Sequence, residues 1–470
     1  MVKTTGSPHP HGGSERIHSR AVASMYGLTP KVEAAIRDAI QKQQWHRLRM
    51  LMDPLHPADK ADFLERISVE DLRILVGQLG LDFDAEILPY LHEEVREIVR
   101  NFLDPDVFAA SLPELDSDDV VTIAEELRPE QLDRALAALP AQDRVLVEQS
   151  LAYPEDSAGR MMQREMVVVP PFWTVGQTID FLRSSELYRE EFYLIMVTDA
   201  SGHPVGEVRL NKLLCAHRPR RIVEIMDTEI RSIPTTMDQE EVALLFRRYG
   251  MITTSVIDEE GCLVGIITLD DIIDVIDEEA EEDLMALAGV SDASIRTSVL
   301  ETLQGRAPWL FVNLITAVIA SVVIGFFEST IEKVVALAVL MPIVASMGGN
   351  AGTQTVTVAV RAIAMREFSP KVAITFGLRE LYVGIANGLI FAMVTAGLSY
   401  VWLGDTQIAL VLAVAILVNM VVATISGTLI PLSLVKVGVD PAIASSVFIT
   451  TITDVIGFLV FLGLAALYLL

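Results

Sequence analysis

Cysteine and histidine are scarce in this sequence. The 470 residues include only two cysteines, Cys215 and Cys262, and no histidine follows His217. A framework of disulfides is therefore excluded, and sites for soft metals, which prefer thiolate and imidazole ligands, are disfavoured beyond residue 262. Because both cysteines occupy related positions of an internal repeat, we expect two buried thiols in a reducing compartment.

Basic side chains are missing from two long stretches. Residues 249–295 hold thirteen carboxylates and residues 101–127 hold eight, and neither stretch contains Lys or Arg. The chain has 36 Lys and Arg against 63 Asp and Glu, a formal net charge of -27, whereas residues 305–470 carry seven of each sign. All of the net charge thus belongs to residues 1–304. Such a surface argues against nucleic acid as a partner, because phosphates need basic side chains, and favours divalent cations.

Residues 305–470 contain five apolar runs long enough to cross a bilayer, so membrane lipids are expected partners. The runs are 307–327, 334–360, 381–404, 406–435 and 442–470. Seven basic residues then fall on one side, against Lys333 alone on the other: Arg296, Arg306, Arg361, Arg366, Lys371, Arg379 and Lys436. The positive-inside rule predicts a multi-pass protein of the plasma (inner) membrane, with cytoplasmic N-terminal domains and the C-terminus outside.

Asp454 is the only charged residue between 441 and 470. A carboxylate at membrane depth costs about 2.5 to 3.5 kcal/mol, so it persists mainly where it faces water or binds a cation. Thr450 and Thr451 lie within one helical turn of it, and we expect the three side chains to form an ion site in a pore. The alternative is a hydrogen-bonded aspartate that joins two helices. With an odd number of spans and one such residue, a homodimer is the simpler way to enclose a pore.

The second span is rich in glycine. It carries Pro342 and then Gly348, Gly349 and Asn350. Glycine and proline weaken a helix, and broken backbone is tolerated at membrane depth only where it lines water or protein. We therefore expect a break here whose carbonyl groups face a hydrated ion. The alternative is that the small residues allow close helix packing.

The soluble half begins with a helical region. Amphipathic segments start at Pro57, Ser68, Ser117, Pro129 and Pro140, where Pro or Ser favours a helix N-terminus, and they predict an all-α solenoid of helical hairpins. Its carboxylates Asp118 and Asp119 belong either to a solvated face or to a face that meets another acidic domain through cations. Residues 1–28 are polar and expected to be disordered.

An internal repeat follows the helical region. Residues 199–206 align with 258–265 at a spacing of 59, and each copy predicts the order strand, helix, strand, hairpin, strand, helix. The pattern resembles a tandem pair of CBS domains, an α/β module. That resemblance implies adenosine nucleotides or ions as ligands, so ATP is a candidate ligand of the pair.

A run of acids follows the second copy. If it is helical, six carboxylates share two faces: Asp271, Asp274 and Glu278 on one, and Glu279, Glu282 and Asp283 on the other. Like charges at these spacings repel, and divalent cations would remove the repulsion. Ligands that are all oxygen suit hard ions, Mg²⁺ in particular. The alternative is a solvated helix. Asp258 and Glu259 in the second hairpin are further candidate ligands.

Two membrane motifs resemble those of one family. They are Pro342-Ile-Val-Ala-Ser-Met-Gly-Gly-Asn-Ala-Gly-Thr-Gln354 and Asp440-Pro-Ala-Ile-Ala-Ser-Ser-Val-Phe-Ile-Thr-Thr-Ile-Thr-Asp454. They strongly resemble the MgtE family of magnesium transporters, and the order of domains is also similar. We expect a disordered segment 1–28, a helical N domain 29–155, a CBS pair 156–277 (copies 156–220 and 221–277), an acidic connecting helix 278–304 and a pore domain 305–470 with five transmembrane helices.

The resemblance implies a homodimeric Mg²⁺ channel, with a pore between subunits lined by the second and fifth spans. It implies that cytosolic Mg²⁺ closes the pore by binding Asp118 or Asp119 opposite five acids: Asp271, Asp274, Glu279, Glu282 and Asp283. One departure is Thr424 in the fourth span, where family members can carry asparagine, although Asn419 lies about a turn away.

Three other functions are weighed against this one. A broader transporter would also carry Mn²⁺ or Co²⁺. A membrane-anchored CBS nucleotide sensor would need no carboxylate at membrane depth. A metal-dependent membrane hydrolase would need a nucleophile or base near bound metal, and the spans contain no His or Cys. We therefore expect a transporter and no enzyme.

Overall fold

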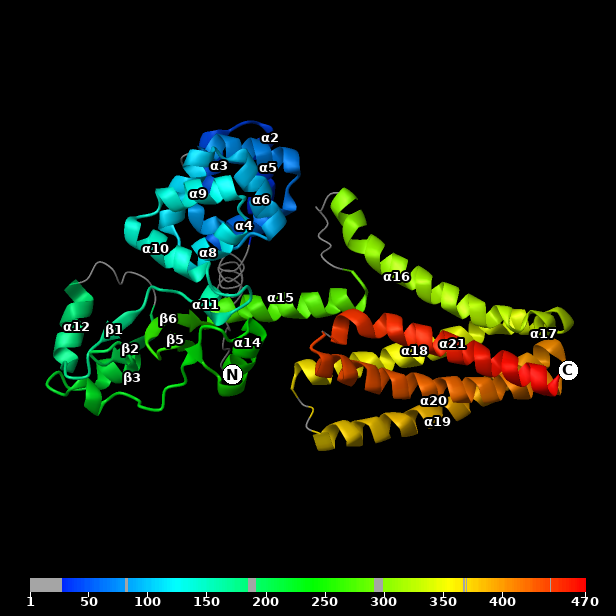
Figure 1. The fold of residues 1–470 in the computed structure, drawn as a ribbon. Coiled ribbons are helices and arrows are strands. Elements are labelled where there is room, and N and C mark those ends of the chain that lie inside the picture. The colour runs from blue at the N-terminus through cyan, green and yellow to red at the C-terminus, as the bar shows by residue number, and fades with distance from the viewer. Residues whose placement is uncertain are drawn as a thin grey trace, which may run out of the picture. The chain divides into compact units, whose positions relative to one another are not determined.

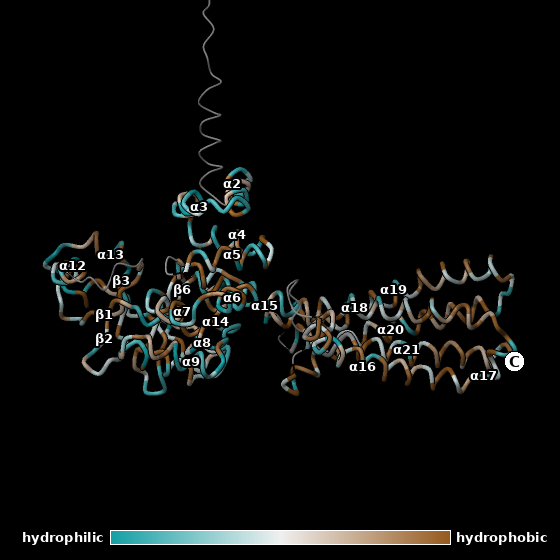
Figure 2. Tube along the Cα trace, turned by 90° about the horizontal axis from the view of Figure 1, so that it is seen from above, coloured by the Kyte–Doolittle hydropathy of each residue, from teal (hydrophilic) through white to brown (hydrophobic). Residues whose placement is uncertain are grey.

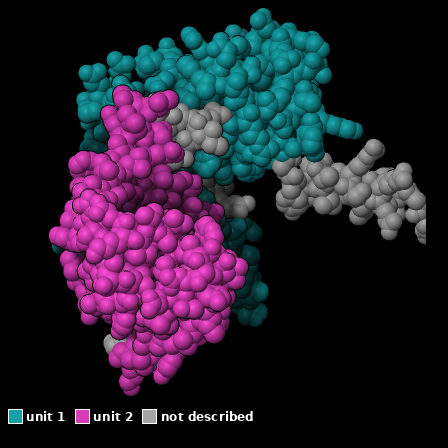
Figure 3. All heavy atoms as spheres, turned by 90° about the vertical axis from the view of Figure 1, so that its right-hand side faces the viewer, with its two compact units in different colours: residues 1–275 teal, residues 276–470 magenta. Residues whose placement is uncertain are grey.

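The computed structural model describes residues 28–80, 83–184, 192–290, 299–366, 368, 370–439 and 441–470. The chain forms two compact units, Met1–Val275 and Ile276–Leu470 (Figure 3). Arg296, Asp440 and the expected disordered segment, apart from Leu28, lie outside the described residues. The domain boundaries expected from the sequence stay predictions, and the one at 277–278 falls within a single helix, α15 (Leu269–Leu287).

The first unit begins with a set of short helices (Figure 1). They are α2 (Pro30–Gln41), α3 (Trp45–Met52), α4 (Pro57–Arg66), α5 (Val69–Leu79), α6 (Glu93–Phe102), α7 (Pro105–Ser111), α8 (Ser117–Glu125), α9 (Pro129–Ala138) and α10 (Ala141–Ser150), with 3-10 turns η2 (Ala85–Ile87) and η3 (Leu112–Glu114). Their apolar faces share one core, from Ile36 to Val147. The predicted helix starts are confirmed: Ser68 Oγ, for example, accepts a hydrogen bond from the Asp71 amide at 3.1 Å.

Two three-stranded sheets follow, one for each copy of the repeat. The first copy has α11 (Ala158–Met161), β1 (Val167–Val169), α12 (Val175–Ser184), β2 (Leu194–Thr198), β3 (Pro204–Arg209), α13 (Leu210–Cys215) and η4 (Ile222–Glu224), and the second has β4 (Ile233–Pro234), α14 (Gln239–Tyr249), β5 (Thr253–Ile257), β6 (Leu263–Thr268) and α15. In each sheet the first two strands are parallel and the last two antiparallel. The predicted order of elements is therefore confirmed.

The two copies exchange segments reciprocally. Gln163, from the start of the first copy, pairs with Ile266 in the second, and Asp227, from the start of the second, pairs with Glu207 in the first. Beside these bridges, a Cβ on Gly206 would lie 2.7 Å from Met226 Sδ, and one on Gly265 would lie 2.8 Å from Met162 Sδ. Each copy thus packs a methionine against a glycine of the other, and glycine is needed at both contacts.

Two parts of the expectation for the cysteines are wrong, their burial and their related positions in the repeat. Cys215 ends α13 and is exposed, while Cys262 lies in the turn before β6 and is partly exposed. At the spacing of 59 the counterpart of Cys262 is His203, not Cys215. The two thiols therefore occupy unrelated positions, and both are free.

The second unit holds the membrane helices. They are α16 (Val299–Gly325), α18 (Ala336–Ala364), α19 (Pro370–Leu403), α20 (Thr406–Val437) and α21 (Pro441–Tyr468), with the short α17 (Glu328–Lys333) after α16. By length and composition, five helices in the described part of the chain are able to cross a bilayer, and Figure 2 shows the hydrophobic colour along them. The five predicted spans are confirmed. The third begins earlier than expected, at Lys371, so that Glu380 lies within it.

The predicted break in the second span is wrong. Helix α18 continues through Pro342 and the glycines without interruption. Backbone groups in hydrocarbon have no water to bond, which favours an intact helix despite its glycines. The glycines instead allow close packing, since a Cβ on Gly352 would overlap the Ile449 side chain on α21. The alternative interpretation, packing by small residues, is the correct one for Gly348 and Gly352.

Candidate metal and pore sites

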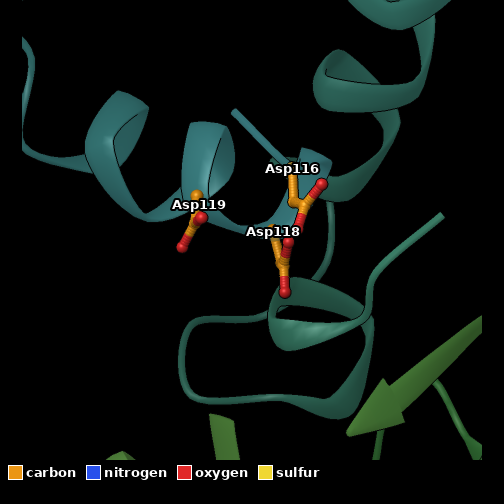
Figure 4. A group of neighbouring side chains, drawn as sticks. All are labelled: Asp116, Asp118 and Asp119. Carbon is orange, nitrogen blue, oxygen red and sulfur yellow. The ribbon is translucent and has the colours of Figure 1, made fainter. Parts of the chain in front are cut away.

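Three carboxylates gather at the start of α8. Oxygens of Asp116, Asp118 and Asp119 lie within 4.8 Å of one another (Figure 4), and Asp118 is only 9% exposed. Asp116 precedes the helix as its N-cap residue, so the chain turns here and brings the three side chains together. Among the described residues this is the group of acids that meets the geometry of a metal site.

The electrostatics of this cluster involve a fourth acid, Asp271, in the first turn of α15. Burial raises the pKa of Asp118 well above its ordinary value, and the Asp271 charge adds to this. Burial likewise raises the pKa of Asp119 to about 7 and that of Asp271 to about 6. Asp118 Oδ1 has no hydrogen-bond partner in the described part of the chain. Buried carboxylates so close together need protons or cations, and an all-oxygen ligand set suits Mg²⁺.

The CBS pair holds α8 in place. Glu165, near the start of the first copy, accepts hydrogen bonds from Ser117 Oγ at 2.7 Å and Ser117 N at 3.3 Å. Next to it, the Arg164 side chain donates to the Val264 carbonyl at 2.8 Å and to Ser150 Oγ at 3.2 Å. A carboxylate at a helix N-terminus is stabilising, and here it comes from another domain. These bonds place the acids of α8 beside the first turn of α15.

Two arginines pair with Glu126, at the other end of α8. Arg96 Nε is 2.9 Å from Glu126 Oε1, and the nearest Arg100 nitrogen is 3.8 Å from Glu126 Oε2. Burial nevertheless raises the pKa of Glu126 to about 7. The Arg96 charge also lowers the pKa of Asp119, against the larger effects that raise it. Arg96 therefore compensates the cluster only in part.

The structure brings together Asp118, Asp119 and Asp271 of the predicted regulatory set. The pKa of Tyr90 is raised mainly by burial, then by the charges of Asp119 and Asp270, and then by that of Asp274. Asp274 and Asp119 thus both lie near Tyr90. Asp116 was missed, although the spacing Asp-x-Asp-Asp signals it. The other predicted acids of α15 lie in its second half: Glu278, Glu279, Glu282 and Asp283.

The hairpin acids lie elsewhere in the first unit. Asp258 Oδ1 accepts hydrogen bonds from the amides of Glu260 at 3.0 Å and Cys262 at 2.8 Å, which stabilise the turn. Asp258 and Glu259 line a cavity of about 450 Å³ beside Tyr153. One oxygen of Asp258 thus has a structural role, and the predicted metal role of the pair stays a prediction.

A polar face runs along α18. Five of its side chains are exposed on the single chain and recur at helical spacing: Ser346, Asn350, Thr353, Gln354 and Thr357. Gly349 lies within this face, and a Cβ there would meet nothing within 4 Å. The hydroxyls of Thr353 and Thr357 bond carbonyls of their own helix. The amides of Asn350 and Gln354 have more donors and acceptors than the helix satisfies, and hydrocarbon offers them no partner, so we expect this face to meet water or another protein surface.

Helix α21 presents the predicted ion site beside α18. Thr450 is exposed, and Thr451 and Asp454 are partly exposed, whereas Thr453 is fully buried. The Thr451 hydroxyl donates to the Val447 carbonyl of its own helix at 2.7 Å. The predicted pore residues Gly348, Gly349 and Asn350 lie on α18, and this helix packs against α21 through Gly352 and Ile449.

The end of the acidic helix reaches these same spans. Ala286 and Leu287 of α15 pack against a small apolar cluster formed by the ends of α18, α20 and α21, whose members are Val356, Val360, Ile430, Ala442 and Ile449. A change in the position of α15 would therefore act on the helices that carry the polar face and Asp454.

Thr424 does not face these helices. Its hydroxyl donates to the carbonyls of Met420 at 3.1 Å and Val421 at 2.9 Å, and the side chain fills the space left by Gly384 of α19. Asn419, on another side of α20, faces α18 and α21. The sequence identified this asparagine only as a neighbour of Thr424.

Three family descriptions match the chain. "Divalent cation transporter" matches residues 341–464, "MgtE intracellular N domain" 55–156 and "CBS domain" 222–278. The chain is 32% identical to the magnesium transporter MgtE of Bacillus subtilis, over 92% of this chain and 94% of that protein. It is 32% identical to the magnesium transporter MgtE of Thermus thermophilus, over 94% of this chain and 99% of that protein.

A solved structure is also similar in sequence. The cytosolic domain of the Mg²⁺ channel MgtE in complex with ATP is 32% identical, with a TM-score of 0.49, over 52% of this chain and 99% of that chain.

Proposed function

The chain belongs to the MgtE family of magnesium transporters, and from this membership we propose that it is a homodimeric Mg²⁺ channel that cytosolic Mg²⁺ closes. The family consists of transporters, and the five apolar helices make the chain a multi-pass membrane protein. Transport of Mg²⁺ is its function. The direction into the cytoplasm, the route, the dimer, the cytoplasmic side of the N-terminal domains and the control by Mg²⁺ are the proposal.

The observation that carries the permeation route is the polar face of α18, a helix that packs against the Asp454 helix α21. A single chain leaves this face exposed. A second copy related by a two-fold axis would enclose it and place two Asp454 carboxylates across one pore. Hydroxyls and amides such as those of Thr450 and Asn350 would contact the water shell of the ion, since Mg²⁺ dehydrates reluctantly.

Control by cytosolic Mg²⁺ is supported by the buried acids Asp118, Asp119 and Asp271. Without a cation their repulsion opposes docking of α8 on the CBS pair, and a bound cation would favour docking. At a hundredfold excess over Kd, one such site stabilises the state that binds it by about 2.7 kcal/mol. The contact of Ala286 and Leu287 with the spans offers a direct connection to the pore.

The proposal is tested by ion uptake into proteoliposomes. We expect Mg²⁺ uptake by the wild type and loss of uptake by Asp454→Asn, with Asp405→Asn as the control. Asp405 Oδ1 caps α20 by accepting from the Gln407 amide at 2.7 Å, and asparagine also serves as an N-cap. Normal uptake by a folded Asp454→Asn dimer would contradict the assigned route.

The same assay distinguishes a Mg²⁺-selective channel from the alternative, a broader divalent-cation transporter. Oxygen ligands also suit Mn²⁺, so a broader transporter would take up Mn²⁺ or Co²⁺ as fast as Mg²⁺. We expect Mg²⁺ uptake to be the fastest. ATP stays a predicted ligand of the CBS pair, to be measured by calorimetric titration of the whole protein with ATP.

A further inference from the structure

Asn419 lies where three spans meet. Its side chain is 1% exposed, and Nδ2 donates a hydrogen bond to the Val344 carbonyl of α18 at 2.9 Å. A Cβ at Gly348 of α18 would overlap the amide, and a Cβ at Gly457 of α21 would lie 2.7 Å from Nδ2. Both glycines therefore leave room for this one side chain.

A buried amide such as that of Asn419 is unusual in a membrane helix whose other buried side chains are mostly apolar. An aliphatic side chain would bring no polar group to satisfy, whereas Asn419 Oδ1 has no hydrogen-bond partner among the described residues. An unsatisfied buried acceptor is unfavourable. The amide is therefore less favourable than an apolar side chain for packing alone. What it provides is a directional hydrogen bond between α20 and the backbone of α18.

The two contacts of Asn419 are close to the pore residues along each helix. Val344 lies six residues, under two turns, before Asn350 on α18, and Gly457 lies three residues, less than one turn, after Asp454 on α21. Asn419 therefore touches both helices of the permeation route at the level of their polar residues, from a helix that contributes no exposed polar face there.

We propose that Asn419 is a positioning residue of the pore, which sets the spacing between α18 and α21 and so the position of Asp454 relative to the polar face. The inference rests on the proposed permeation route. Asn419 does not contact the ion in this proposal. It acts through Val344 and Gly457.

The test uses a size exchange between Asn419 and Gly348. Asn419→Leu removes the bond and keeps the branched shape of the side chain, although leucine is larger. Gly348→Ala places a methyl against the amide, and the double variant Gly348→Ala/Asn419→Ala gives that methyl room but still lacks the bond. Thr424→Val is the matched control, because Thr424 is equally buried on α20 and its hydroxyl bonds only within that helix.

We expect Asn419→Leu to elute as the wild-type oligomer while its Mg²⁺ uptake per protein falls about fivefold, the factor that corresponds to about 1 kcal/mol. Its preference for Mg²⁺ over Ca²⁺ should also fall, which a purely structural role would not change. Gly348→Ala should lose more uptake than the double variant, and Thr424→Val should match the wild type.

Two outcomes would overturn the inference. One is wild-type uptake and wild-type ion preference in Asn419→Leu. The other is wild-type uptake and wild-type ion preference in the double variant Gly348→Ala/Asn419→Ala, because that variant also lacks the hydrogen bond. This second outcome decides the question if Asn419→Leu fails to assemble. Absence of Mg²⁺ uptake by the wild type itself would instead contradict the proposed function, so the two failures are distinct.

Discussion

Ser117 and Glu165 are 48 residues apart in the sequence, yet the hydroxyl of the first donates to a carboxylate oxygen of the second at 2.7 Å. The bond joins the helical N-terminal region to the first copy of the repeat. It also fixes the N-terminus of α8, the turn that carries Asp118 and Asp119. The geometry of the acidic cluster therefore depends on a carboxylate outside it.

Glu165→Ala should weaken docking of the N-terminal region. The loss of a helix-capping partner costs about 1 kcal/mol. The Mg²⁺ concentration that gives half-maximal protection of residues 1–290 from proteolysis should then rise about fivefold. Glu155→Ala, an exposed carboxylate near the same junction, is the control. Equal midpoints for Glu165→Ala and the wild type would show that this bond does not stabilise the docked state.

The triple variant Asp118→Asn, Asp119→Asn and Asp271→Asn should dock without Mg²⁺. Amides of the same shape remove the repulsion between the buried carboxylates and also the cation ligands. Small-angle scattering should give the same compact radius with and without Mg²⁺, and open probability in patches should no longer fall with cytosolic Mg²⁺. Wild-type inhibition by Mg²⁺ in this variant would mean that the cluster is not the sensor.

A second variant tests the acids in the second half of α15 independently of the buried cluster. Neutralising Glu279, Glu282 and Asp283 leaves the buried cluster intact. If these acids bind a regulatory cation of their own, inhibition should shift to higher Mg²⁺ while protection of α8 from proteolysis is unchanged. A loss of both responses would show that the two groups of acids act as one site.

Docking in the absence of divalent cations should depend on pH. The pKa of Asp119 is about 7 and that of Asp271 about 6 in the docked state, against about 3.9 for an exposed aspartate. Between these values the docked state binds more protons, so its stability falls as pH rises from about 4 to about 7. In EDTA, α8 should be better protected from proteolysis at about pH 5 than at about pH 8. The triple asparagine variant should lose this difference.

The neighbouring glycines of the second span should respond differently to leucine. Gly348→Leu would push against Asn419 and should prevent assembly, whereas Gly349→Leu points into open space on the polar face and should fold but conduct poorly. Size-exclusion yield and Mg²⁺ uptake measure the two effects. Full uptake by Gly349→Leu would place the polar face away from the pore.

Local patterns predicted most of the fold. Helix starts at Pro57 and Pro129 and the repeat at a spacing of 59 depend on short-range chemistry, and the structure confirms them. The break at Gly348 and Gly349 was wrong because helix propensity measured in water does not hold where the backbone has no water to bond.

Contacts between distant residues were harder to predict. Nothing in the apolar run around Asn419 indicates that its partner is the Val344 carbonyl, 75 residues earlier. Asp116 was missed as a site residue for another reason. It belongs to a stretch so rich in acids that a single turn, rather than the composition, decides which three carboxylates meet.

The exchange between the two repeat copies has a consequence for how this region can be divided. A fragment that ends between the copies would expose Gly206 and lose the bridge between Asp227 and Glu207. A fragment that begins there would lack Met162 and Gln163 in the same way. We therefore expect neither copy to fold when it is expressed or transplanted singly, and we expect the pair to be the smallest piece of this region that forms a complete fold.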